Sequence, residues 1–187
     1  MRWPSLFADL EAQLEAADAA ELAGEVAERV RTEQARVSTA DRLAAATGCA
    51  VTVTVPGVDR LHGRLDDAGP DWLLLSEDGG RSALVPLAAV LAVSGVPRSG
   101  PAPDQGPAAT QVRRALDLRR ALRGLARDRA GVAVWLRDGS ALAGTVDRVG
   151  ADHLDLAEHP PGEARRPGAV RTVRLVPLTA VSVVRSA

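Results

Sequence analysis

The chain has 187 residues, of which 46% are hydrophobic and 25% charged, and its formal net charge at pH 7 is −1. This profile is typical of a globular protein with one or two small domains and excludes a disordered chain. The longest nearly apolar run, Leu84–Val96, is too short to cross a bilayer, and the first residues lack the pattern of a secretory signal, so we expect a cytoplasmic protein.

The amino-terminal region, residues 1–47, is predicted to be helical. Ser5 is a suitable N-cap, and leucine and valine recur after it at helical spacing. Acidic residues outnumber arginines between residues 5 and 36, whereas arginine dominates a second predicted helix, residues 109–129. We expect two solvated helix faces, and the docking of the acidic helix on the basic one is the alternative.

Two segments of the chain are similar to each other, which indicates a duplicated domain. Residues 51–75 align without a gap with residues 132–156, at an offset of 81. The sequence LVPLAAV at 84–90 returns as LVPLTAV at 175–181, so the second copy carries ten extra residues. We expect these extra residues in a lengthened hairpin loop because they are rich in proline, glycine and arginine.

Each copy shows the alternation of short, half-buried strands separated by glycine-containing turns. Gly63 and its counterpart Gly144 lie inside strand patterns, where a missing side chain permits a bend or a close backbone approach. The pattern predicts an α+β fold with two tandem five-stranded small β-barrels, each preceded by an α-helix, and a long acidic N-terminal helix. The barrels are expected at 48–95 and 130–187, with a Pro/Gly linker at 96–108.

The second copy resembles the Sm/LSm family, in particular its bacterial member Hfq, and the chain as a whole resembles a protein family of actinobacteria. The similarity rests on Leu136–Gly139, on the Leu-x-Gly-x-Val pattern of 142–146, and on the closing strand at 180–184. It implies Sm-like (SH3-like) barrels that pair through their last-strand edges, within one chain or in a closed ring of chains. The uridine pocket of Hfq falls on 177–179, Pro-Leu-Thr, which offers no cation.

The resemblance also implies an RNA contact at the basic rim before the first strand of the second barrel, where Arg127 and Arg129 stand. Guanidinium groups bind phosphate oxygens in a bidentate manner. The predicted nucleic-acid-binding residues lie on the arginine-rich helix and at this rim. They are Arg113, Arg114, Arg119, Arg120, Arg123, Arg127 and Arg129.

Motifs for catalysis are missing from the sequence, and we expect no enzyme and no cofactor. Without lysine there is no phosphate-binding loop of the Walker type, and no glycine-rich dinucleotide motif occurs. The polar segment 152–159 would place His153, Asp155 and His159 on one strand face, which is more often a solvated face than a metal site, so no metal is expected. Trp72 and Trp135 are expected to cover a barrel end or an interface rather than to stack on bases.

Two functions remain open from the sequence. The first is binding of single-stranded RNA by the arginine-rich helix and the barrel rim. The second is a protein–protein scaffold or adaptor that uses the barrels for assembly as a homo-oligomer, without nucleic acid. Neither involves a membrane.

Overall fold

The computed structural model describes residues 3–97, 115–162, 165–166 and 168–186. These residues form two units, of which the first ends at Ser38 and contains a single helix. The elements in chain order are α1 (Trp3–Arg36), α2 (Thr39–Ala45), β1 (Ala50–Thr54), β2 (Leu61–Ala68), β3 (Trp72–Glu77), β4 (Ser82–Pro86), β5 (Ala92–Ser94), α4 (Leu118–Asp128), β6 (Gly131–Leu136), β7 (Ala141–Val149), β8 (His153–Glu158), β9 (Thr172–Pro177) and β10 (Val181–Ser186). Short 3-10 helices precede β5 and β10.

The first unit is the 34-residue helix α1. Leu22, Val26 and Val30 follow one another at four-residue spacing and are all exposed. Its ion pairs, Arg31 with Glu28 and Arg36 with Glu33, join residues three apart on the exposed surface and add little to stability. No helix in the described part of the chain combines the length and apolarity that a bilayer crossing requires.

All ten strands of the second unit form one open antiparallel sheet, in the order β5-β1-β2-β3-β4-β10-β6-β7-β8-β9. The predicted fold class of two tandem Sm-like five-stranded barrels, each preceded by a helix, is therefore wrong. Neither half closes its five strands on themselves. In the first half, β5 spans three residues and pairs with β1 at one end of the sheet, so it does not meet β4. The free edge of β4 pairs with β10 instead.

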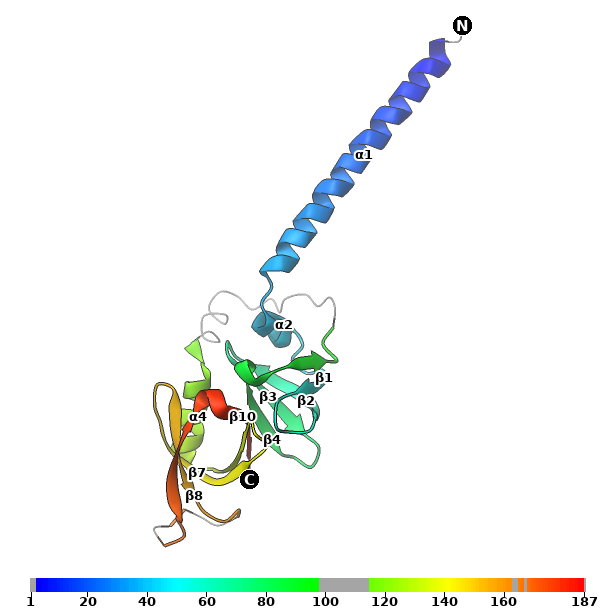
Figure 1. The fold of residues 1–187 in the computed structure, drawn as a ribbon. Helices are drawn as coiled ribbons and strands as arrows, with labels where there is room; N and C mark the ends of the chain where they lie inside the picture. The colour runs from blue at the N-terminus through cyan, green and yellow to red at the C-terminus, as the bar shows by residue number, and fades with distance from the viewer. Residues whose placement is uncertain (1–2, 98–114, 163–164, 167, 187) are drawn as a thin grey trace. The chain divides into compact units, whose positions relative to one another are not determined.

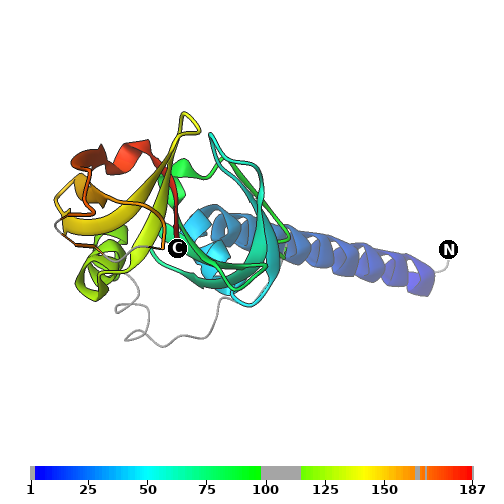
Figure 2. The ribbon, with the colours of Figure 1, turned by 90° about the horizontal axis from the view of Figure 1, so that it is seen from below.

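The joint between the halves is the antiparallel pairing of β4 with β10, which places Val184 opposite Leu84 and Arg185 opposite Ala83. The last strand, β10, therefore has a strand partner on each side within the chain, β4 and β6, and leaves no unpaired backbone edge there. Figures 1 and 2 show the strands of the two halves curling away from this joint.

The two halves bury separate cores on opposite faces of the shared sheet. In β4, Ala83 and Val85 contribute to the first core and Leu84 contributes to the second. In β10, Val183 faces the first core and Val184 the second. Successive side chains of a strand point to opposite faces, so these two strands serve both cores at once. Helix α2 contributes to the first core, and α4 covers the second.

Polar contacts also tie the halves together at the loops. The Arg137 guanidinium donates from Nε to the Thr179 carbonyl at 2.8 Å and from Nη2 to the Ala88 carbonyl at 2.6 Å. A Cβ on Gly57 would lie 2.5 Å from the backbone nitrogen of Gly139, so only glycine permits this approach of the two turns.

Candidate nucleic-acid interface

Helix α4 carries most of the predicted RNA-binding residues, and its sequence explains where it begins. The Asp117 carboxylate accepts a hydrogen bond from the backbone N–H of Arg120 at 2.9 Å, which is N-cap geometry. The helix therefore starts at Leu118, although the sequence predicted a helix from 109, and residues 98–114 lie outside the described residues. Leu118 and Leu122 are buried in the second core at helical spacing, which leaves the arginines on the opposite side.

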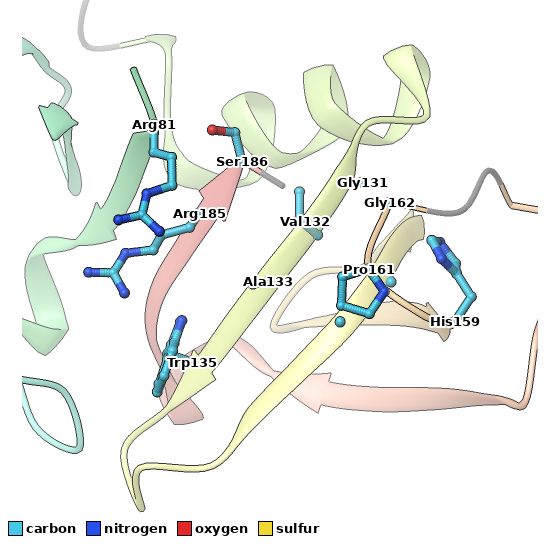
Figure 3. A pocket seen from close by; sticks show the side chains of 12 residues that line it. Arg81, Gly131, Val132, Ala133, Trp135, His159, Pro161, Gly162, Arg185 and Ser186 are labelled. Carbon is cyan, nitrogen blue, oxygen red and sulfur yellow. The ribbon is translucent and has the colours of Figure 1, made fainter. Parts of the chain in front are cut away.

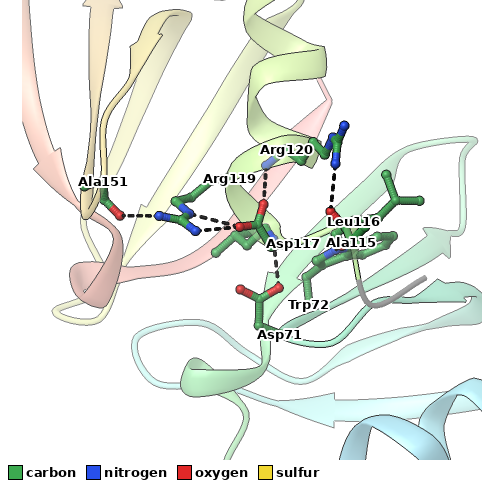
Figure 4. A network of polar contacts seen from close by, with 9 residues as sticks. Asp71, Trp72, Ala115, Leu116, Asp117, Arg119, Arg120 and Ala151 are labelled. Atoms are coloured by element: carbon green, nitrogen blue, oxygen red, sulfur yellow. Dashed lines mark hydrogen bonds and ion pairs between the residues drawn. The ribbon is translucent and has the colours of Figure 1, made fainter. Parts of the chain in front are cut away.

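The first half of the sheet holds the N-terminus of α4 in place (Figure 4). The Asp71 carboxylate accepts from the Leu118 backbone N–H at 2.7 Å, and the Trp72 indole N–H donates to the Leu116 carbonyl at 2.7 Å. Backbone N–H groups of the first helical turn have no partner inside the helix, so the Asp71 carboxylate satisfies one that would otherwise need water, while the Trp72 contact fixes the backbone just before the helix. Because its apolar face packs on one half and its end binds the other, α4 has a defined orientation on the sheet.

The arginines predicted on α4 are all exposed, but they differ in their contacts. Arg119 donates through Nε and Nη2 to Asp117 Oδ2, at 3.0 and 2.8 Å. Arg120 donates to the Ala115 carbonyl at 3.2 Å, so its charge has no carboxylate against it.

The arginines toward the end of α4 are less engaged. Arg127 lies 3.9 Å from the Asp128 carboxylate, and Arg123 makes no hydrogen bond or ion pair with a described residue. Arg129 follows the helix in the left-handed conformation. Arg113 and Arg114, also predicted, lie outside the described residues.

Three of these arginines form a ridge along α4. Arg119, Arg123 and Arg127 stand four residues apart, which places successive side chains about 6 Å apart along the helix axis. Helix α4 contains four arginines and one aspartate, whereas the chain as a whole has a net charge of −1. Positive charge is thus concentrated on the exposed side of α4.

The Asp117 cap gives stability a pH dependence. The side-chain hydrogen bond from Arg119, followed by the backbone hydrogen bond from Arg120, lowers the pKa of Asp117 below its ordinary value. Because the pKa of Asp117 is lower in the folded state, its ionised carboxylate stabilises the fold at pH values above the pKa of the unfolded chain. This stabilisation is lost as the pH falls through the folded-state pKa. We expect Asp117→Asn, which keeps a capping oxygen, to lose stability at pH 7 relative to the native chain, and to lose less at about pH 3, below the ordinary pKa of an aspartate.

Urea unfolding at the two pH values measures this difference. Asp117→Ala serves as the comparison because it also removes the capping acceptor, at about 1 kcal/mol. A constant gap between the native chain and Asp117→Asn from pH 7 to pH 3 would contradict the charge-based explanation.

A polar cavity of about 470 Å³ lies at the C-terminal end of α4, between this helix and strands β7 to β9. Its charged lining residues are Arg129, Asp147, Arg148, Asp155 and Arg165. Sequence reasoning identified Arg129 among them as a nucleic-acid-binding residue, and it considered Asp155 only as part of a strand face that could hold a metal. An alignment of the two repeats could have pointed to Arg148, because the first copy has an aspartate, Asp67, at the matching position, and the charge there is reversed between the copies.

An apolar cavity of about 270 Å³ lies on the outer face of β6 and β7 (Figure 3). Trp135, Arg81 and Arg185 border it on one side and Pro161 on the other. Arg185 is held by Glu77 through two hydrogen bonds of 2.8 Å, so its charge is already compensated. The sequence could not indicate this cavity, because its lining comes from both halves.

The polar segment at 152–159 does not converge on a metal-binding arrangement. His153 Nδ1 lies 2.9 Å from Asp152 Oδ1, and this hydrogen bond lowers the pKa of Asp152. His159, at the other end of β8, is buried and donates from Nδ1 to the Pro160 carbonyl at 3.0 Å, while its Nε2 lies 2.8 Å from the Thr145 hydroxyl. Among the described residues, no three acidic, histidine or cysteine side chains gather as metal ligands would.

No family model matches the chain, and no curated protein is similar to it. The resemblance to the Sm/LSm family therefore stays a prediction, and the functional argument rests on the residues themselves.

Proposed function

We propose that this protein binds single-stranded RNA through the exposed arginine face of α4, in the cytoplasm and without catalysing a reaction. The observation that carries the proposal is the anchored helix itself. Asp71 and Trp72 hold its N-terminus, the second core holds its apolar side, and Arg119, Arg120 and Arg123 stand on the exposed side with Arg127. A row of guanidinium groups on an anchored helix suits contact with successive phosphates.

The chemistry of the chain favours phosphate contacts over base stacking. Aromatic residues make up 2% of the sequence, and Trp72 is buried at the joint between the halves. Proteins that hold single strands by stacking need exposed aromatic faces, which α4 does not provide. We therefore expect binding with weak sequence preference and strong dependence on salt.

The test is the fluorescence polarisation of a labelled single-stranded RNA at two salt concentrations. For about four phosphate contacts, log affinity should fall with log salt at a slope of about −3. Changing Arg119, Arg120, Arg123 and Arg127 together to glutamine should weaken binding by on the order of 100-fold and flatten the slope. The native chain failing to bind at low salt would contradict the proposal.

The matched control removes the same number of positive charges elsewhere. Its four glutamine substitutions are at Arg29, Arg60, Arg64 and Arg81, which are exposed residues outside α4. This variant should retain at least about a third of the native affinity, because only general charge attraction is reduced. An equal loss in both variants would show that net charge, and not the α4 face, determines binding.

A specific observation favours the scaffold as the second candidate. Edge strand β9 exposes two large apolar side chains on one face, Val173 at 55% and Leu175 at 60%. An open strand edge with apolar neighbours is a surface on which another chain can add a strand. Light scattering on the same variants distinguishes the candidates, since the scaffold requires an assembly whose size changes without any RNA binding.

A further inference from the structure

Arg129 occupies a backbone position that normally requires glycine. Its φ of 51° makes it the only non-glycine residue with positive φ in the described part of the chain. The matching position of the first copy, 81 residues earlier, is Gly48, with a φ of 90°. Both residues lie just before the first strand of their halves, so the fold demands a left-handed residue there. A side chain in this conformation is unfavourable, which makes an arginine here unexpected on structural grounds.

The Arg129 side chain lines the polar cavity of about 470 Å³ together with Arg148 of β7 and Arg165. Arg165 is occupied, because it donates from Nε and Nη2 to the two oxygens of Asp147, at 2.5 and 2.6 Å. The guanidinium groups of Arg129 and Arg148, in contrast, make no hydrogen bond or ion pair with any residue that the structure describes. Two cationic groups therefore face one cavity with their donors available.

The first copy shows that the fold does not require these charges. β2 and β3 pair in the same register as β7 and β8, with a bulge at the same place, yet Asp67 and Leu74 stand where the second copy has Arg148 and Asp155. Arg165 belongs to the ten residues that the first copy lacks. The first half thus forms the same strand pairing without any of the three arginines of the cavity.

Asp155 gives the cavity an acceptor beside its cations. It is the cross-strand neighbour of Arg148 in the β7–β8 register, but the two side chains form no ion pair. Opposite charges directly across an antiparallel pair usually approach each other. Their separation leaves the Arg148 donors and the Asp155 acceptor open to a third group, one that carries both an anion and hydrogen-bond donors.

We propose that this cavity binds the phosphate monoester of a nucleotide, with Arg129 and Arg148 on the phosphate and Asp155 on a ribose hydroxyl or base amino group. Guanidinium pairs bind phosphate through parallel N–H···O bonds, and the cavity volume is in the range of small-ligand sites. The inference deepens the proposed RNA binding and rests on it for one source of the ligand, the 5′-terminal nucleotide of a bound strand. A free mononucleotide is the other source.

The test is calorimetric titration of the full chain with the four nucleoside 5′-monophosphates, with adenosine as the control that lacks phosphate. Arg129→Gly, which installs the residue of the first copy, should weaken binding by about tenfold or more while the Tm stays equal or rises. Arg148→Gln should weaken it similarly, and Arg60→Gln should not. A native chain that binds none of the nucleotides, or an Arg129→Gly chain that binds them as well as the native one, would overturn the inference.

Two further arms separate the ligand sources and keep this inference distinct from the function of α4. If the strand end is the ligand, a 5′-phosphorylated RNA should bind the native chain more tightly than its 5′-hydroxyl counterpart, and Arg129→Gly should abolish the difference. Equal binding of the two RNAs, with mononucleotide binding intact, identifies the free nucleotide. The variant with four glutamines on α4 should still bind mononucleotides, so the loss of one property leaves the other measurable.

Discussion

Replacing Glu77 with alanine is expected to lower the free energy of unfolding by about 3–5 kcal/mol. The Glu77 side chain is 9% exposed and Arg185 is 20% exposed, and two hydrogen bonds of 2.8 Å join them. The Arg185 guanidinium also lies over the Trp135 ring, 5.7 Å from its centre. Without the carboxylate, a largely buried cation would remain uncompensated.

This ion pair is placed where the two halves meet. Glu77 ends β3 and Arg185 belongs to β10, so the contact passes across β4 from one half to the other. We therefore expect the loss to affect the whole sheet in one cooperative transition and not to release one half alone. Urea unfolding followed by circular dichroism and by tryptophan fluorescence should give coincident curves.

Two further variants test the explanation by charge. Glu77→Gln keeps an acceptor for Arg185 and should cost less than Glu77→Ala. The double variant Glu77→Leu with Arg185→Met removes both charges and should recover most of the lost stability, because a well-packed apolar pair often replaces a buried ion pair without loss. If Glu77→Ala lowers stability by less than about 1 kcal/mol, the pair contributes no more than a surface one.

Gly144→Ala is expected to be at least as damaging, at about 3 kcal/mol or more. A Cβ on Gly144 would lie 2.1 Å from the carbonyl oxygen of Ala157 and 2.9 Å from its carbon, which are backbone atoms of the paired strand β8. Backbone atoms inside a ladder cannot move aside as a flexible side chain can. The β7–β8 pairing would have to separate locally, and with it the wall of the apolar cavity, which Gly144 lines.

The chain provides a matched control for this substitution. Gly124 lies inside α4, and a Cβ there would meet no atom within 4 Å. Gly124→Ala should therefore stabilise the protein by about 0.5–1 kcal/mol, because alanine favours the helix. Thermal unfolding of both variants measures the contrast, and an unchanged Tm for Gly144→Ala would show that β7 and β8 are less closely paired than the structure has them.

Much of the local structure was predictable from the sequence. Alternation at Val51 and Val53 marked β1, and the ten extra residues of the second copy lie in the longer loop between β8 and β9. The arginine face of α4 followed from helical spacing, although its start at Leu118 required recognition of Asp117 as the cap. These features depend on side-chain periodicity and on hydrogen bonds between residues a few positions apart.

The arrangement of the strands was not predictable in the same way. Each repeat has the pattern of a small closed barrel, and periodicity is identical whether β4 pairs with its own fifth strand or with β10. The outcome depends on which edges meet in three dimensions. Trp72 is an example, because its indole N–H binds the carbonyl of Leu116, which lies 44 residues away in the chain. No short-range pattern predicts that contact.

By itself, then, the sequence determined the duplicated strands, the capped helix and the arginines on it, because each follows from residues close together in the chain. Only the tertiary structure decided that both halves share one sheet with a core on either face, and that Arg129, Arg148 and Asp155 line one cavity. Edge pairing and cavity lining depend on contacts between distant residues. Short-range patterns carry no information about those contacts, because the same alternation of side chains is compatible with several partners for each strand edge.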